Sequence, residues 1–246
     1  MRKIELGCCA HTVEEFAARP ADTLYKLADL GYSTIEIGDF SPLGARQFAD
    51  TLKKAGLTAT SMHMSFDYQK IWTPHIMDFA DSIGIRYIVC PMPLACMNSA
   101  DGYKAGAEAL NELGRIYNEN GLKLMYHNHN FEFERFGDKT GHQILLENTD
   151  PEYVGFELDT FWLSIAGEKP EEYIRRLKGR VEIVHLKDRL RDEDDVTAVG
   201  SGILDFKAIL AACEEIGVRI VFVEKDGGVL ADARSSYAYL DQLMNA

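Results

Sequence analysis

Hydrophobic and polar positions along the chain follow two patterns, and the change from one to the other repeats. A helical pattern of apolar residues ends at a glycine, and a β-branched or apolar run begins within a few residues. The glycine supplies the left-handed conformation that closes a helix, and the apolar run is typical of a strand buried on both faces. This junction occurs in LADLGYSTIEI, LKKAGLTATSM, ADSIGIRYIVC, YNENGLKLMYH, RLKGRVEIVH and CEEIGVRIVFVE, and LENTDPEYVGFEL makes it through Asp-Pro.

Together with the first apolar run, KIELGCC, these junctions predict eight strands separated by amphipathic helical stretches. Strand–helix alternation without a hairpin signal implies parallel strands joined by right-handed crossovers. Eight such units in 246 residues fit an α/β fold, a single (β/α)8 TIM barrel. The predicted strands lie near residues 3–8, 33–37, 58–63, 86–90, 122–127, 153–158, 181–186 and 218–224.

The alternative fold is a doubly wound open sheet, which carries a glycine-rich fingerprint after its first strand. The corresponding segment, LGCCAHT, holds a single glycine, so the barrel is favoured. No linker, low-complexity tract or shift in composition divides the chain. We therefore expect one domain over residues 1–246.

Charge and composition narrow the classes of partner. The formal net charge of −13 repels phosphate backbones and anionic lipid, which argues against nucleic-acid and membrane-surface roles. The N-terminal segment lacks the apolar core of a signal peptide, and no run approaches the length of a membrane span. Five cysteines without CxxC spacing suit a reducing compartment. We expect a cytoplasmic protein with a small-molecule partner.

Metal-ligating residue types gather at the carboxyl ends of the predicted strands, where TIM barrels carry their active sites. An unpaired buried carboxylate costs several kcal/mol, whereas carboxylates clustered with an imidazole suit manganese, magnesium or zinc. We therefore expect one divalent metal ion. The residues at these strand ends are Cys9 to His11, Glu36, His63, Pro91, His127 to Glu132, Asp159, His185 to Asp188, Glu224 and Asp226.

Each of these residues alone has an ordinary structural interpretation. A single histidine at a strand end is commonly hydrogen-bonded within the fold, and an Asp before Thr, as at Asp159, commonly caps a helix. Lys187 can form an ion pair with Glu224, Asp226 or Asp159. The combination on adjacent strands of one barrel is what favours a metal site.

Five motifs, in this order, resemble the xylose-isomerase-like barrel family: YHNHNFEF, LDTFW, HLKD, GSGILDF and VEKD. That family includes sugar and sugar-phosphate isomerases, epimerases, inosose dehydratases and metal-dependent endonucleases for abasic sites. The resemblance covers nearly the whole chain, with the specific motifs between residues 126 and 226. It implies one divalent metal held by residues from the last four strands, among them Asp159, His185 and Glu224.

The fifth-strand ligand is where the sequence departs from the family. Epimerases of the family have a Glu near the place of Tyr126 or His127. Glu132, several residues later, is our favoured fourth ligand; His127 or His129 can substitute, or the site has three protein ligands.

The mechanism implied by the resemblance is an isomerisation or epimerisation beside a carbonyl, in which two glutamates serve as base and acid. Glu224 fits one role, and Glu132 or His129 has to take the other. An imidazole in place of a carboxylate also favours elimination of water or of a glycosidic oxygen from a keto-sugar.

Some further residues are candidates for contacts with a sugar, and others are expected to lie outside the site. Alternation along an extended segment directs His127 and His129 the same way, so both can face a cavity. Glu134 is expected in solvent, and GDKTGH is expected to form a turn before a helix, with His142 at the surface. The substrate-binding candidates are Lys187, His127, Trp162, His63 and Glu36.

We therefore predict a divalent-metal-dependent sugar isomerase or epimerase. The alternative is an inosose or keto-sugar dehydratase or a 3-keto-glycoside lyase on the same fold. An abasic-site endonuclease is disfavoured by the charge, and a non-catalytic sugar-binding barrel by the metal-ligand set. A homo-oligomer is expected from the family resemblance alone.

Overall fold

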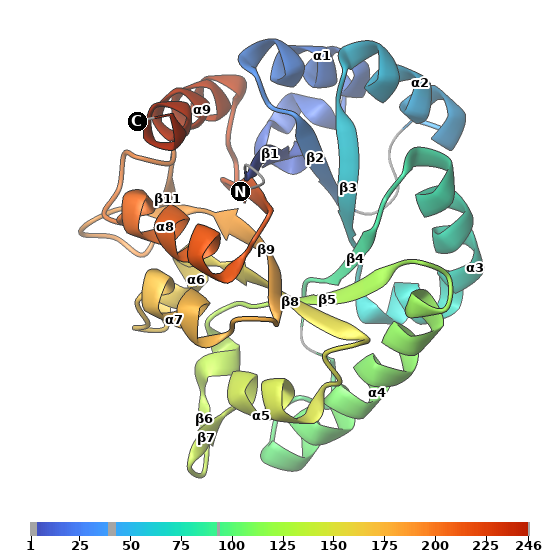
Figure 1. The fold of residues 1–246 in the computed structure, drawn as a ribbon, viewed down its shortest axis with the longest axis vertical. Coiled ribbons are helices and arrows are strands. Elements are labelled where there is room, and N and C mark those ends of the chain that lie inside the picture. Colours follow the sequence, from blue (N-terminus) through green and yellow to red (C-terminus); the bar gives the residue numbers. More distant parts are fainter. Residues whose placement is uncertain (1–3, 39–42, 93, 246) are drawn as a thin grey trace.

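The computed structural model describes residues 4–38, 43–92 and 94–245. Eight parallel strands close into a barrel in the order β1-β12-β9-β8-β5-β4-β3-β2, and helices surround it (Figure 1). The predicted (β/α)8 barrel is therefore confirmed. The barrel strands are β1 (Glu5–Cys9), β2 (Thr34–Gly38), β3 (Thr58–His63), β4 (Tyr87–Cys90), β5 (Lys123–His127), β8 (Val154–Asp159), β9 (Val181–Leu186) and β12 (Ile220–Val223).

The helices follow the strands as the sequence pattern predicts. Gly56 and Gly217 close α2 and α8 with φ of 72° and 88°, in the left-handed region that a side chain would strain. Each strand edge lies within two residues of its predicted position, apart from residue 3, which lies outside the described residues. The α-helices are α1 (Pro20–Leu30), α2 (Ala45–Ala55), α3 (Phe66–Ile83), α4 (Ala100–Asn118), α5 (Gly141–Asn148), α6 (Thr160–Ile165), α7 (Pro170–Arg176), α8 (Phe206–Ile216) and α9 (Leu230–Met244).

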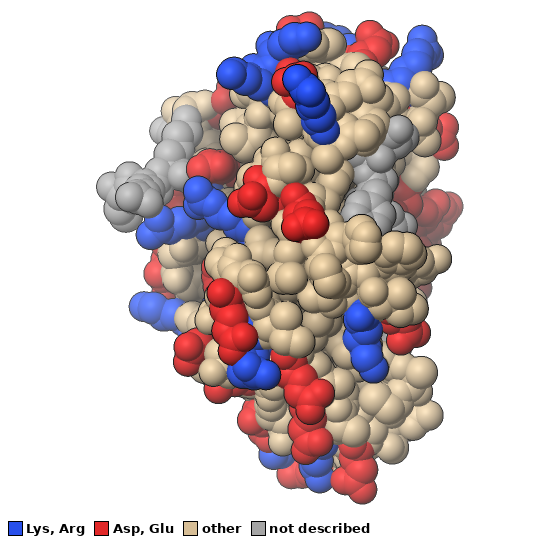
Figure 2. Space-filling view, turned by 90° about the vertical axis from the view of Figure 1, so that its right-hand side faces the viewer, with Lys and Arg blue, Asp and Glu red and all other residues tan. Residues whose placement is uncertain are grey.

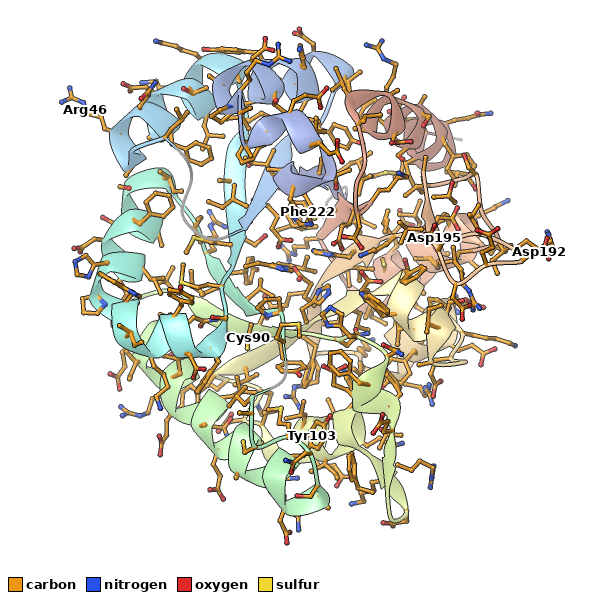
Figure 3. The ribbon with its side chains drawn as sticks, turned by 180° about the vertical axis from the view of Figure 1, so that it is seen from behind. Arg46, Cys90, Tyr103, Asp192, Asp195 and Phe222 are labelled. Carbon is orange, nitrogen blue, oxygen red and sulfur yellow. The ribbon has the colours of Figure 1, made fainter. Side chains whose placement is uncertain are left out.

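Two short antiparallel ribbons, which the sequence pattern did not predict, lie outside the barrel sheet. They pair β6 (Arg135–Phe136) with β7 (Lys139–Thr140), and β10 (Asp188–Arg189) with β11 (Val196–Thr197). Strands of two residues are too short to leave an alternation pattern in the sequence. The second ribbon carries its connecting turn, with Asp192 and Asp195, away from the barrel (Figure 3).

The face that α3 contributes to is mostly uncharged across its middle and rimmed by acidic and basic side chains (Figure 2). Tyr68, Ile71 and Trp72 of α3 are among the exposed large apolar residues. Among the described residues, none of the helices has the length and apolar character needed to cross a membrane.

The barrel interior changes from apolar to polar along its axis. Inside the barrel, Cys9, Ile183, Ile220 and Phe222 form a buried apolar cluster. Gly7 makes room for it, because a Cβ there would lie 2.5 Å from the Phe222 ring. Above this cluster, toward the carboxyl ends of the strands, titratable side chains replace apolar ones.

Candidate metal centre

Four ligand-type residues from adjacent strands converge at the carboxyl end of the barrel. His127 ends β5, Asp159 ends β8, His185 lies in β9, and Glu224 follows β12. One ligand atom from each lies within 4.8 Å of the others, and all four residues are buried. The structure thus brings the predicted residues Asp159, His185 and Glu224 together, with His127 as the fourth.

Asp159 serves a helix and the cluster at once. Its Oδ1 accepts a hydrogen bond of 3.0 Å from the Trp162 backbone and so caps α6. Its Oδ2 is buried without a hydrogen-bond partner. Burial raises the pKa of the Asp159 carboxyl to about 8, although the charges of Lys187 and His185 oppose the shift. The helix cap is therefore present, and it leaves Oδ2 available to a metal ion.

The Glu224 carboxylate contacts three other side chains. Its Oε2 lies 2.7 Å from His185 Nδ1, and its Oε1 lies 3.1 Å from His11 Nε2 and 3.3 Å from Lys187 Nζ. Burial opposes its charge, but Lys187 and His185 outweigh that effect and hold the Glu224 pKa well below its usual range. Glu224 is therefore ionised and ready to bind a cation.

Lys187 forms the ion pairs that its sequence position allowed. Its ammonium lies 2.8 Å from Asp226 Oδ2 in addition to its contact with Glu224. It also lies 5.5 Å from the centre of the Trp162 ring. Burial opposes the charge, but the carboxylates outweigh it and raise the Lys187 pKa. Lys187 is thus a buried, permanently charged donor beside the four-residue group.

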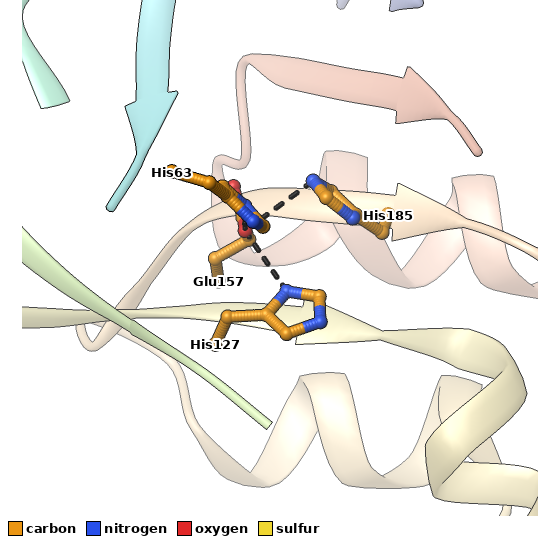
Figure 4. A group of neighbouring side chains, drawn as sticks. All are labelled: His63, His127, Glu157 and His185. Carbon is orange, nitrogen blue, oxygen red and sulfur yellow. Dashed lines mark hydrogen bonds and ion pairs between the residues drawn. The ribbon is translucent and has the colours of Figure 1, made fainter. Parts of the chain in front are cut away.

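A second group of potential ligands lies deeper in the barrel and shares two members with the first. His63, His127, Glu157 and His185 offer ligand atoms within 4.8 Å of one another (Figure 4). Glu36 is fully buried beside them, 3.0 Å from His63 Nε2 and 2.8 Å from His185 Nε2. Glu36 and His63 therefore line the barrel interior next to the metal-ligand group.

Sequence reasoning missed Glu157, although a signal for it was present. Glu157 stands two residues before Asp159, and residues two apart in a strand point to the same face. Once Asp159 is placed toward the barrel axis, Glu157 has to point inward as well. It is fully buried, and its Oε1 has no hydrogen-bond partner.

Glu132, our favoured fourth ligand, occupies a different place. A 3-10 turn (Phe131–Phe133) folds its carboxylate back, where Tyr126 Oη donates to Oε1 at 2.7 Å and the His129 backbone donates to Oε2 at 2.8 Å. Among the described residues, no potential metal-ligand group includes Glu132. His127 occupies the position that the sequence left open.

We expect the free energy of unfolding to depend on pH through the titration of the Glu132 carboxyl. Burial raises its pKa from the ordinary 4.5 to about 7, so the folded state holds this proton more tightly than the unfolded chain does. Stability contributed by the group is present below pH ~4.5 and declines as pH rises toward ~7. In denaturant unfolding of the metal-free protein, the free energy of unfolding of Glu132→Gln should rise relative to that of wild type by up to about 3 kcal/mol between these pH values.

The exposed Glu134→Gln variant is the control for this titration, because its carboxylate is solvated as expected from the sequence. Its stability should follow the wild-type pH profile. A constant difference between Glu132→Gln and wild type from pH 4.5 to 8 would contradict the assigned shift.

His129 is half-buried among aromatic rings at the mouth of the group. Its ring lies 5.1 Å from the Phe131 ring and 5.0 Å from the Trp162 ring. Burial, with the nearby positive charges, lowers the His129 pKa to about 3. Its Nδ1 has no hydrogen-bond partner. His129 is therefore a neutral imidazole with an unused nitrogen beside the site.

The prediction that His142 lies at the surface was wrong. His142 is fully buried, its Nδ1 lies 2.7 Å from Tyr173 Oη, and its ring stacks on Phe133. The turn before α5 was correctly predicted, but α5 presents this residue to the core. His142 and the metal-ligand groups are separate in the described residues.

The donor set fits a divalent cation. Two imidazoles and two carboxylates are ligands that zinc and manganese accept. The unpartnered Oδ2 of Asp159 is the kind of buried atom that such an ion satisfies.

Comparison with known proteins decides the family. Residues 24–241 match the family model described as xylose isomerase-like TIM barrel. The chain belongs to this family. The resemblance found in its motifs is thereby confirmed for most of the chain length.

Curated relatives that match part of this chain are named inosose dehydratases. An inosose dehydratase of Bacillus cereus is 30% identical over 142 residues, which cover 49% of this chain and 46% of the relative. The chain thus spans about half the length of the curated relatives that it matches.

Solved structures are similar over nearly the whole chain. A sugar phosphate isomerase/epimerase of Parabacteroides distasonis has a TM-score of 0.82 and 26% identity, covering 98% of this chain and 94% of that one. The IolI protein, solved with a bound zinc atom, has a TM-score of 0.76 and 19% identity, covering 98% of both chains. The latter likeness shows the fold alone.

Proposed function

We propose that the chain is a divalent-metal-dependent lyase that eliminates water, or an equivalent β-oxygen leaving group, from a cyclic keto-polyol such as an inosose or keto-sugar. This is the second of the two reactions considered from the sequence. His127, Asp159, His185 and Glu224 are the proposed ligands, and zinc or manganese is the proposed ion.

One observation carries this choice of reaction. Epimerisation by two glutamates was expected to use Glu132 beside Glu224, but the Glu132 carboxylate is bound by Tyr126 and by the backbone of His129. An imidazole with an unpartnered Nδ1, that of His129, lies beside the ligand group, with its ring 5.1 Å from the His127 ring. Elimination from a keto-sugar needs one base that removes the proton next to the carbonyl and one donor for the leaving oxygen, and His129 with Lys187 meets that need.

The names of the relatives support the same choice. The curated relative of Bacillus cereus described above is named an inosose dehydratase. The zinc of the IolI structure supports a divalent ion in this barrel. Because the sequence match covers about half of those relatives, the activity of the whole chain is a proposal.

The roles of the residues follow from their places. A bound divalent ion supplies a Lewis acid for the substrate carbonyl oxygen. His129 removes the proton from the carbon next to that carbonyl, and the electrons of the C–H bond form a double bond as the neighbouring C–O bond breaks. The departing oxygen takes the proton that His129 holds and leaves as water, while the Lys187 ammonium donates a hydrogen bond to it.

The second candidate is epimerisation, which the likeness to a sugar phosphate isomerase/epimerase favours. His129 would then be the base on one face and Glu224 the group on the other. In both reactions we propose a small sugar or polyol as the partner. The charge of −13 continues to argue against a polyanionic partner such as nucleic acid.

One experiment separates the two reactions. The metal-loaded protein is incubated in D2O with a panel of inososes, ketoses and 3-keto-glycosides, and products are followed by ultraviolet absorbance and mass spectrometry. Elimination yields a conjugated enone and a product lighter by one leaving group. Incorporation of deuterium with no loss of mass would instead establish epimerisation and overturn the lyase proposal.

A further inference from the structure

One oxygen of Glu157 faces three imidazole rings. Glu157 Oε2 lies 2.7 Å from His63 Nε2, 2.9 Å from His127 Nδ1 and 3.3 Å from His185 Nε2 (Figure 4). The three histidines come from β3, β5 and β9, and Glu157 comes from β8. Two of the three, His127 and His185, are proposed metal ligands.

The geometry around Glu157 indicates which way these contacts run. Its Oε2 faces three ring nitrogens while its Oε1 has no hydrogen-bond partner, which is the arrangement of a carboxylate acceptor among imidazole donors. An ionised carboxylate can only accept hydrogen bonds, so each ring nitrogen that faces it has to carry a hydrogen. For His127 that nitrogen is Nδ1, and for His185 it is Nε2.

The opposite nitrogen of His127, Nε2, is then left with a lone pair. His185 Nδ1 faces the ionised Glu224 at 2.7 Å, on the side of the four-residue ligand group. It therefore carries a hydrogen in the metal-free protein, and a bound ion would take the place of that hydrogen. We propose that Glu157 is a positioning residue that, through one shared oxygen, fixes the ring orientation of both histidine ligands and the tautomer of His127. This inference rests on the proposed metal site.

The same contacts argue against Glu157 as a ligand of a second ion. An ion between Glu157 and the rings would need the nitrogens that carry the hydrogens in this arrangement. His127 and His185 could serve two ions only by losing both ring hydrogens. A carboxylate that receives the second ring nitrogen of a ligating histidine is the usual outer partner of such a ligand.

Glu36 provides a matched control within the same cluster. It is also a fully buried carboxylate, and it contacts His185 and His63. Its described contacts do not include His127. Substitution of Glu36 should therefore leave the tautomer of His127 unchanged, whereas substitution of Glu157 should not.

The first test is nitrogen-15 NMR of the imidazoles in the metal-free protein. We expect His127 of the wild type to carry its hydrogen on Nδ1. In Glu157→Met, which keeps the length but has no acceptor, we expect a mixture of both tautomers, while Glu36→Gln keeps the wild-type signal. A wild-type His127 with its hydrogen on Nε2 would overturn the proposal even if no variant folded.

The second test is affinity for Zn2+, measured by competition with a chromogenic chelator. Loss of an outer partner typically weakens binding about 10- to 100-fold. We expect a loss in this range for Glu157→Met and a smaller loss for Glu157→Gln, with one ion still bound per chain. Wild-type affinity in both variants overturns the positioning role.

Metal stoichiometry separates the remaining outcomes. Two ions per wild-type chain and one in Glu157→Gln would make Glu157 a ligand and overturn the proposal. If Asp159→Asn keeps its ion, the proposed metal site fails, while the His127 tautomer still reports on Glu157. If no keto-sugar reacts but the affinity series holds, the proposed reaction alone fails.

Discussion

Asp159→Asn is expected to lose its bound divalent ion. The substitution keeps the shape of the side chain and leaves Oδ1 able to cap α6, but it removes the charge and the free carboxylate oxygen from the ligand group. Loss of an outer partner of a metal ligand costs about 10- to 100-fold in affinity, so loss of a ligand should cost more than about 100-fold. Elemental analysis after dialysis should find about one ion per chain in wild type.

The matched control for Asp159→Asn is Asp226→Asn. Asp226 is a neighbouring carboxylate that contacts Lys187 and is largely exposed, so its loss should leave the metal content unchanged. His185→Ala should lose the ion as Asp159→Asn does. Equal metal content in wild type, Asp159→Asn and His185→Ala would remove the basis of the proposed site.

His129→Asn is expected to lower turnover by about 100- to 10,000-fold, the usual contribution of a positioned acid–base group. The metal content should not change, because His129 lies outside the four-residue ligand group. The pairing of lost turnover with a retained ion is the diagnostic result. It is measured by steady-state kinetics and elemental analysis on the same preparation, with the substrate identified by the panel.

Two further variants test which carboxylates the reaction needs. Glu224→Gln should also abolish turnover, but it should weaken metal binding, because Glu224 belongs to the ligand group. Glu132→Gln should retain most turnover, because its carboxylate is bound by Tyr126 and the His129 backbone. Full activity in His129→Asn would exclude this imidazole as the base.

The barrel could be predicted from local signals because each unit carries them in its own sequence. Each helix-closing glycine followed by an apolar run marks one unit, and repetition of the unit leaves few topologies. The proposed metal ligands Asp159, His185 and Glu224 could be named because strands of known direction place their carboxyl ends together. For these residues, position along the strand is enough to predict that their side chains lie close together.

The identity of the fourth proposed ligand could not be predicted from strand position. The choice between Glu132 and His127 depends on the 3-10 turn after β5, which folds Glu132 toward Tyr126. Loop geometry of that kind leaves no periodic signal. The burial of His142 was missed for a related reason, because the short helix α5 shows too few turns to reveal which face packs inward.

Asp159 links the proposed ion site to the start of the following helix. One oxygen holds the Trp162 backbone while the other faces the ligand group. An engineered segment that changes what this barrel accepts therefore has to begin beyond Trp162. Grafts that begin earlier would shift the first turn of α6 and, with it, the carboxylate on which the chemistry depends.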